Sequence, residues 1–235
     1  MSGVIRGKTD VSEGASRALP FDITNPPPWI SEVWQLAESR GTGDEIKRVV
    51  HGNGHGPVLN GMAAGINQVV GWEGDIADRR AAELTLAYVR NALEASRGAA
   101  LYRDCKERWD AAAPGAFLAY EIARSLELPM PGAIFTSAAL RSYRPLLTPW
   151  QFPRCIDEPI RFFARPFGAG AYFLPTAAIH VADKLALAED WTAALDLIQP
   201  KVLDLLGVDP ERMTGVRTAF TARPEAIDDF RALLP

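Results

Sequence analysis

The chain is poor in the side chains that build metal centres and activated nucleophiles. Its 235 residues include only 3 histidines and 2 cysteines. Cys105 and Cys155 fit no metal-binding or redox spacing, which favours a reducing, cytoplasmic setting. No serine stands in a Gly-x-Ser-x-Gly motif. These shortages disfavour a hydrolase with an activated nucleophile and a cysteine-bound metal.

Long apolar runs and an excess of positive charge are also missing. No stretch approaches the roughly 18–20 apolar residues that span a bilayer, and residues 1–20 lack the apolar centre of a signal peptide. The net charge is −4, whereas binding to a phosphate backbone requires a concentrated cationic face. The sequence therefore predicts a cytoplasmic protein without a nucleic-acid or membrane partner.

Strand patterns with a period of two residues are absent, whereas helical patterns run through most of the chain. Proline and glycine separate these patterns, as where Pro200 begins a predicted helix and Gly207 ends it. Asp209 before Pro210 is typical of a helix N-terminus. The predicted fold class is all-α, with helices over residues 29–36, 44–50, 57–68, 78–96, 101–113, 116–126, 132–142, 152–163, 176–188, 191–198, 200–206 and 224–234.

Three breaks in these patterns lead to further expectations. Pro114 and Gly115 are expected to end one helix, and Pro159 is expected to kink or restart another. Residues 167–172 read as a glycine-rich loop, which lacks the Lys-Ser/Thr pair that completes a phosphate-binding loop. His51 and His55 are spaced for half a zinc site, but the glycines around them favour a turn.

His180 and Asp183 are more informative, because residues three apart on a helix lie on the same side. They could share a metal with ligands from other helices, or they could simply form hydrogen bonds. Their segment, Ile-His-Val-Ala-Asp, resembles the Val-His-Leu-Ala-Asp helix of HDOD domains, the signalling relatives of the HD phosphohydrolases. Residues 150–166 look like the family's Trp-Gly-Leu-Pro … Ala-Ile-Arg-Tyr-His-His … Pro segment. Shorter similarities follow the same order at residues 57–67, 89–93 and 205–211.

The resemblance covers residues 26–215 and implies a multi-helix, HDOD/HD-like bundle with an N-terminal helical lobe. Residues 1–25 mix Gly, Ser, Asp, Lys and Arg without periodicity and are expected to form a flexible tail. Residues 216–235 are expected to form a C-terminal helical extension. Catalytic HD proteins hold a metal with a first His, an adjacent His-Asp pair and a later Asp. The matching positions here, within residues 110–117 and 139–142, contain no histidine, and Phe163-Ala164 stands for the family's His-His. Of the metal ligands of catalytic HD proteins, only the later Asp has a counterpart in this sequence, which is Asp183.

The resemblance therefore implies a degenerate site with no catalytic residue, no cofactor and no metal, because one carboxylate cannot hold a divalent cation. Asp183 is expected to pair with an arginine that replaces the charge of the metal. His180 is expected to bond either to Asp183 or to a neighbouring carbonyl. The candidates for this vestigial pocket are His180, Asp183, Arg141, Arg161 and Arg165.

The sequence thus predicts a non-catalytic regulatory protein of bacterial signal transduction that acts through protein partners. Two alternatives remain open. One is a metal-dependent phosphohydrolase that has rebuilt its site with other residues. The other is a sensor that binds a small ligand, such as a nucleotide, in the vacated pocket between helices.

Overall fold

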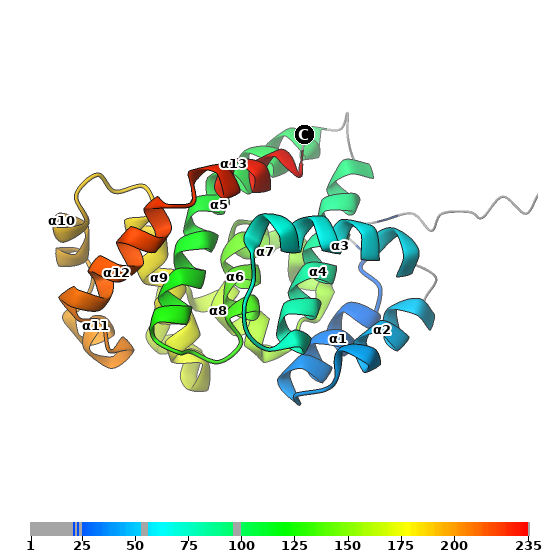
Figure 1. The fold of residues 1–235 in the computed structure, drawn as a ribbon, viewed down its shortest axis with the longest axis horizontal. Coiled ribbons are helices and arrows are strands. Elements are labelled where there is room, and N and C mark those ends of the chain that lie inside the picture. Colours follow the sequence, from blue (N-terminus) through cyan, green and yellow to red (C-terminus); the bar gives the residue numbers. More distant parts are fainter. Residues whose placement is uncertain (1–20, 22, 24, 53–55, 96–99, 235) are drawn as a thin grey trace, which may run out of the picture.

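A computed structural model of the chain describes residues 21, 23, 25–52, 56–95 and 100–234. All regular elements among these residues are helices, so the predicted all-α class is confirmed (Figure 1). None of these helices is long and apolar enough to cross a membrane. The elements are α1 (Trp29–Glu38), α2 (Gly43–Gly52), α3 (Gly56–Val70), α4 (Ile76–Ala95), α5 (Ala100–Ser125), α6 (Pro131–Leu140), η1 (Arg141–Tyr143), α7 (Arg144–Leu147), η2 (Thr148–Trp150), α8 (Arg154–Phe162), η3 (Pro166–Tyr172), α9 (Phe173–Leu185), α10 (Trp191–Asp196), α11 (Pro200–Leu206), α12 (Pro210–Thr221) and α13 (Pro224–Ala232).

Helix α6 is the centre of the molecule. Every residue from Gly132 to Leu140 is buried, and the helix packs against α4, α5, α8 and α9. Its sequence contains no charged side chain, and a helix that is apolar on all sides must be surrounded by others. In Figure 1 it lies between α4 and α5, inside the bundle.

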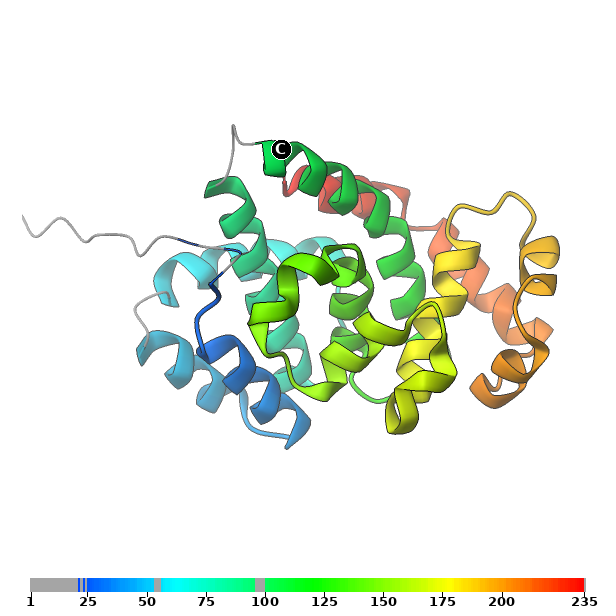
Figure 2. The same cartoon turned by 180° about the vertical axis from the view of Figure 1, so that it is seen from behind.

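The two ends of the molecule are built by consecutive helices. At one end α1, α2 and α3 pack on α4, as expected of an N-terminal helical lobe. At the other end α10 and α11 pack on α9, and α12 packs on α5 (Figures 1 and 2). The chain then returns as α13, which lies on α3 and α5. The domain boundary expected at residues 215 and 216 falls inside α12.

The last part of the expected tail is packed against the helices. Residues 1–20 lie outside the described part of the chain. The ring of Phe21 lies 5.3 Å from the ring of Tyr88, and the carbonyl of Ile23 accepts a 2.7 Å hydrogen bond from Nε1 of Trp150.

The prediction that a helix ends at Pro114 and Gly115 was wrong. Helix α5 continues through Pro114 and Gly115, although they were expected to end it. Both residues are buried, and the buried side chains on either side hold the helix together despite the missing N–H. Helix α8 continues through Pro159, so the helix does not restart there. The expected loop at residues 167–172 is instead two short 3₁₀ turns, together labelled η3, and the backbone kinks between them at Gly170, which has a φ of +56°.

Candidate functional site

The centre of the candidate site is an ion pair between Arg141 and Asp183. Arg141 follows the last residue of α6, and Asp183 lies on α9. The guanidinium donates from Nε (3.0 Å) and from Nη2 (2.9 Å) to Oδ1 of Asp183, and Nη1 donates to the carbonyl of Ala138. The side chain of Arg141 is only 9% exposed and that of Asp183 is 31% exposed. A charge-assisted pair with this much burial is stronger than a typical surface pair.

Gly115 on α5 makes room for this pair. A Cβ atom at residue 115 would lie 3.0 Å from Nη2 of Arg141, which is tighter than an ordinary contact, so the guanidinium packs closely against the backbone of Gly115. By sequence Gly115 was predicted only to end a helix with Pro114, so this role was not predicted. The alanines on both sides of Pro114 and Gly115 are the signal that could have indicated a close approach of helices here. Helices α5, α6 and α9 therefore meet at one guanidinium.

His180 does not join the pair. Its Nδ1 lies 2.9 Å from the carbonyl of Phe163, so Nδ1 carries the proton and donates it. This agrees with the second of the two expected partners, a neighbouring carbonyl. Burial lowers the pKa of His180, which favours the neutral ring. Its ring forms part of the wall of a separate cavity of about 480 Å³, and Arg165 lines the same cavity.

Arg161 does not approach Asp183 either. Its Nε lies 3.1 Å from Oδ2 of Asp157, one turn earlier on α8, and both side chains are exposed by about half. The five candidates therefore separate into three places. Arg141 and Asp183 form the buried pair, His180 and Arg165 line a cavity, and Arg161 belongs to a surface pair.

The residues around Asp183 do not fit a divalent metal. Within the described part of the chain, no three His, Cys, Asp or Glu side chains are grouped to hold one. The group that Asp183 binds is a guanidinium, whose positive charge repels a cation. Among the other histidines, Nε2 of His51 lies 3.4 Å from the amide of Asn60, and His55 lies outside the described residues.

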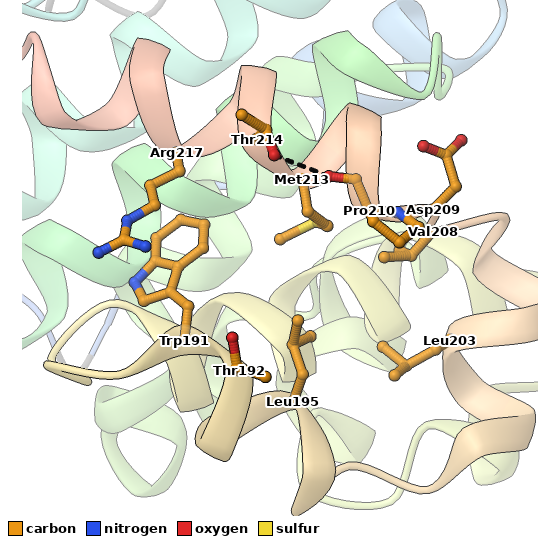
Figure 3. A pocket seen from close by; sticks show the side chains of 10 residues that line it. All are labelled: Trp191, Thr192, Leu195, Leu203, Val208, Asp209, Pro210, Met213, Thr214 and Arg217. Atoms are coloured by element: carbon orange, nitrogen blue, oxygen red, sulfur yellow. Dashed lines mark hydrogen bonds between the residues drawn. The ribbon is translucent and has the colours of Figure 1, made fainter.

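A second concave surface lies between α10, α11 and α12 (Figure 3). Leu195, Leu203 and Met213 line this groove of about 370 Å³. Three of its polar side chains already have partners within the fold. Asp209 accepts from the N–H of Arg212 at 2.8 Å and caps α12, Thr214 donates to the carbonyl of Pro210 at 2.9 Å, and the guanidinium of Arg217 lies 5.6 Å from the ring centre of Trp191.

Comparison with known proteins gives a similarity in fold. No family model matches the chain, and no curated protein matches it. The crystal structure of a "putative phosphohydrolase" from Shewanella amazonensis SB2B superposes with a TM-score of 0.57. The match covers 90% of this chain and 95% of that chain, at 16% sequence identity. The two proteins share a fold. At this identity the likeness concerns the fold alone, so the chemistry of that protein is not carried over.

Proposed function

We propose that the chain is a non-catalytic, HDOD-type regulatory protein of the cytoplasm that acts in signal transduction through contacts with other proteins. The all-α fold and its likeness to the Shewanella protein support an HD-like architecture. The order of the HDOD-like segments along the chain supports the regulatory branch of that architecture.

The observation that carries this proposal is the pairing of Arg141 with Asp183. Asp183 is the single residue of the family's ligand set that the resemblance retains, and its carboxylate is bound by a guanidinium rather than left for a cation. A bound guanidinium supplies a positive charge but offers no coordination position to a water molecule. Gly115 is part of the same adaptation, because it accommodates the guanidinium.

The competing function is metal-dependent phosphoester hydrolysis, which the name of the Shewanella protein suggests for that protein. Metal analysis of the purified chain separates the two functions. We expect transition metals and Mg²⁺ at background level in the wild type and in Asp183→Ala. We also expect no hydrolysis of bis(p-nitrophenyl) phosphate or p-nitrophenyl phosphate after Mn²⁺, Mg²⁺ or Fe²⁺ is added.

About one metal ion per wild-type chain, lost in Asp183→Ala together with hydrolysis, would show that the chain is an enzyme. A regulatory role also predicts that the tagged chain retains specific proteins from its native lysate. It predicts further that folded Asp183→Asn retains the same proteins, because no step of the proposed role uses the carboxylate as a ligand.

A further inference from the structure

The cavity beside His180 has the size and composition of a small-molecule site. Its volume of about 480 Å³ falls within the range of about 300–1,000 Å³ that is typical of ligand pockets. The end of α8, η3, α9 and the start of α11 form its walls, which are mostly apolar. The apolar side chains are those of Phe162, Ala164, Pro166, Phe167, Leu197 and Val202.

Local packing builds these walls. A Cβ atom at residue 168 would lie 2.5 Å from the ring of Phe162, so the ring packs directly on the backbone of Gly168. Phe167 is stacked on Phe173 with ring centres 5.2 Å apart, yet it remains 45% exposed, and Leu197 is 81% exposed. Large apolar side chains exposed at the edge of a cavity are typical of a binding site.

Three polar groups of the cavity are left for a ligand. With Nδ1 of His180 bonded to Phe163, Nε2 is the remaining nitrogen, and in the neutral ring it accepts a hydrogen bond. The side chains of Arg165 and Gln199 also line the cavity. Within the described part of the chain, neither has a hydrogen-bond or ion-pair partner.

The charge that lines the cavity is positive, although the carboxylate of Asp183, which is paired with Arg141, lies one turn from His180 on α9. None of its lining residues is acidic, whereas Arg165 is positive. Lys201 adds a second positive charge, because its Nζ lies 5.7 Å from the centre of the Phe167 ring. The groove of Figure 3 differs in this respect, since it is lined by the acidic Asp209 as well as by Arg217. The lack of an acidic side chain among the described lining residues distinguishes the cavity beside His180 from that groove.

We infer that this cavity binds a small organic anion that has an apolar body and one hydrogen-bond donor. The carboxylate or phosphate of the ligand pairs with Arg165 and Lys201, its apolar body lies against Phe162 and Leu197, and its O–H or N–H donates to Nε2 of His180. The inference goes beyond the proposed function and does not depend on it, because binding requires neither a metal nor turnover.

Four related probes test each part of this inference on the full chain, by titration followed with ligand-observed NMR. The probe 4-hydroxyphenylacetate carries the anion, the ring and the donor, and we expect saturable binding with a Kd of about 1 mM or tighter. Phenylacetate lacks the donor and is expected to bind about fivefold more weakly. Tyramine replaces the anion with a cation and is expected not to bind. Phenyl phosphate, compared with phenylacetate, identifies which anion the site prefers, because neither probe carries the donor.

Two matched arginine variants locate the binding. Arg165→Glu is expected to weaken binding of the preferred anion at least about tenfold, because it reverses a charge in the cavity. Arg161→Glu makes the same change on a nearby arginine outside the cavity, and we expect less than about a twofold change. His180→Phe is expected to remove the difference between 4-hydroxyphenylacetate and phenylacetate. A thermal melt monitors the folding of each variant.

The inference is wrong if neither anion binds saturably to the wild type, a result that is independent of any variant's folding. Equal affinity for tyramine and 4-hydroxyphenylacetate, or equal losses in Arg165→Glu and Arg161→Glu, would also overturn it. Release of phenol from phenyl phosphate would contradict the proposed function instead, and the two failures are therefore distinguishable.

Discussion

The carboxylate of Asp78 caps a helix to which it does not belong, since its Oδ2 accepts a 2.6 Å hydrogen bond from the backbone N–H of Gly132. Its Oδ1 accepts a second bond, of 2.9 Å, from the N–H of Ala133. Asp78 lies on α4 and is buried, and Gly132 lies in the first turn of the central helix α6. A Cβ atom at residue 132 would lie 2.8 Å from Oδ2. The pair therefore joins two core helices at a contact that requires glycine.

At about pH 4, replacing Asp78 with Asn is expected to lower the free energy of unfolding by about 2–4 kcal/mol, because an amide has one acceptor oxygen for two buried N–H groups. Urea unfolding measures this change. Asp209→Asn is the matched control, since Asp209 caps α12 in an exposed position and Asn is an equally good N-cap. Equal losses in the two variants would contradict the buried-cap interpretation.

The pH dependence of stability provides a separate test of Asp78. Burial raises the pKa of its carboxyl group to about 7 from an ordinary value of 3.8, while the two N–H bonds oppose this rise. Between these values the folded state holds more protons than the unfolded state, so this contribution to stability falls as the pH rises. We expect the difference in unfolding free energy between wild type and Asp78→Asn to shrink from about pH 4 to about pH 7. If this difference in unfolding free energy stayed constant from about pH 4 to about pH 7, the raised pKa of Asp78 would be refuted.

Asp183→Asn tests how much the buried ion pair contributes to the free energy of unfolding. The variant leaves the guanidinium of Arg141, which is largely buried, without a charged partner, and we expect a loss of about 1–3 kcal/mol. Asp157→Asn is the control, because it breaks the exposed pair with Arg161 and should cost less than about 0.5 kcal/mol. Chemical denaturation measures the free energy of unfolding of both variants. Similar losses would mean that the buried pair stabilises the fold no more than the exposed pair does.

The last helix, α13, is expected to contribute to the stability of the core. The ring of Phe230 stacks on Trp109 with centroids 4.6 Å apart, and the carbonyl of Phe230 accepts a 2.9 Å bond from Nε1 of Trp109. Phe230→Ala should therefore cost about 3–5 kcal/mol. Leu187→Ala, at a side chain that is 76% exposed, should change stability by less than about 0.5 kcal/mol. Thermal or urea unfolding of both variants checks this, and a small loss in Phe230→Ala would make the segment a detachable extension.

Local patterns predicted the helices well where capping residues mark their ends. Asp209 caps α12 as expected, and Gly207 ends α11 with a φ of +74°. These features depend on residues within one turn of each other, so the sequence contains the information. The predicted helix end at Pro114 was wrong, because tertiary packing stabilises α5 by more than the proline destabilises it. No local sequence pattern contains information about that packing.

The sequence by itself determined the helical class, most of the helix ends and the absence of the family's histidines. Which cation pairs with Asp183 was decided only by the tertiary structure, because Arg141 and Asp183 are 42 residues apart in the chain. Three arginines were equally eligible by sequence. The end of α6, the glycine of α5 and the face of α9 must converge before one of them can reach the carboxylate. That convergence is a property of long-range packing, which also places His180 and Arg165 together in a separate cavity.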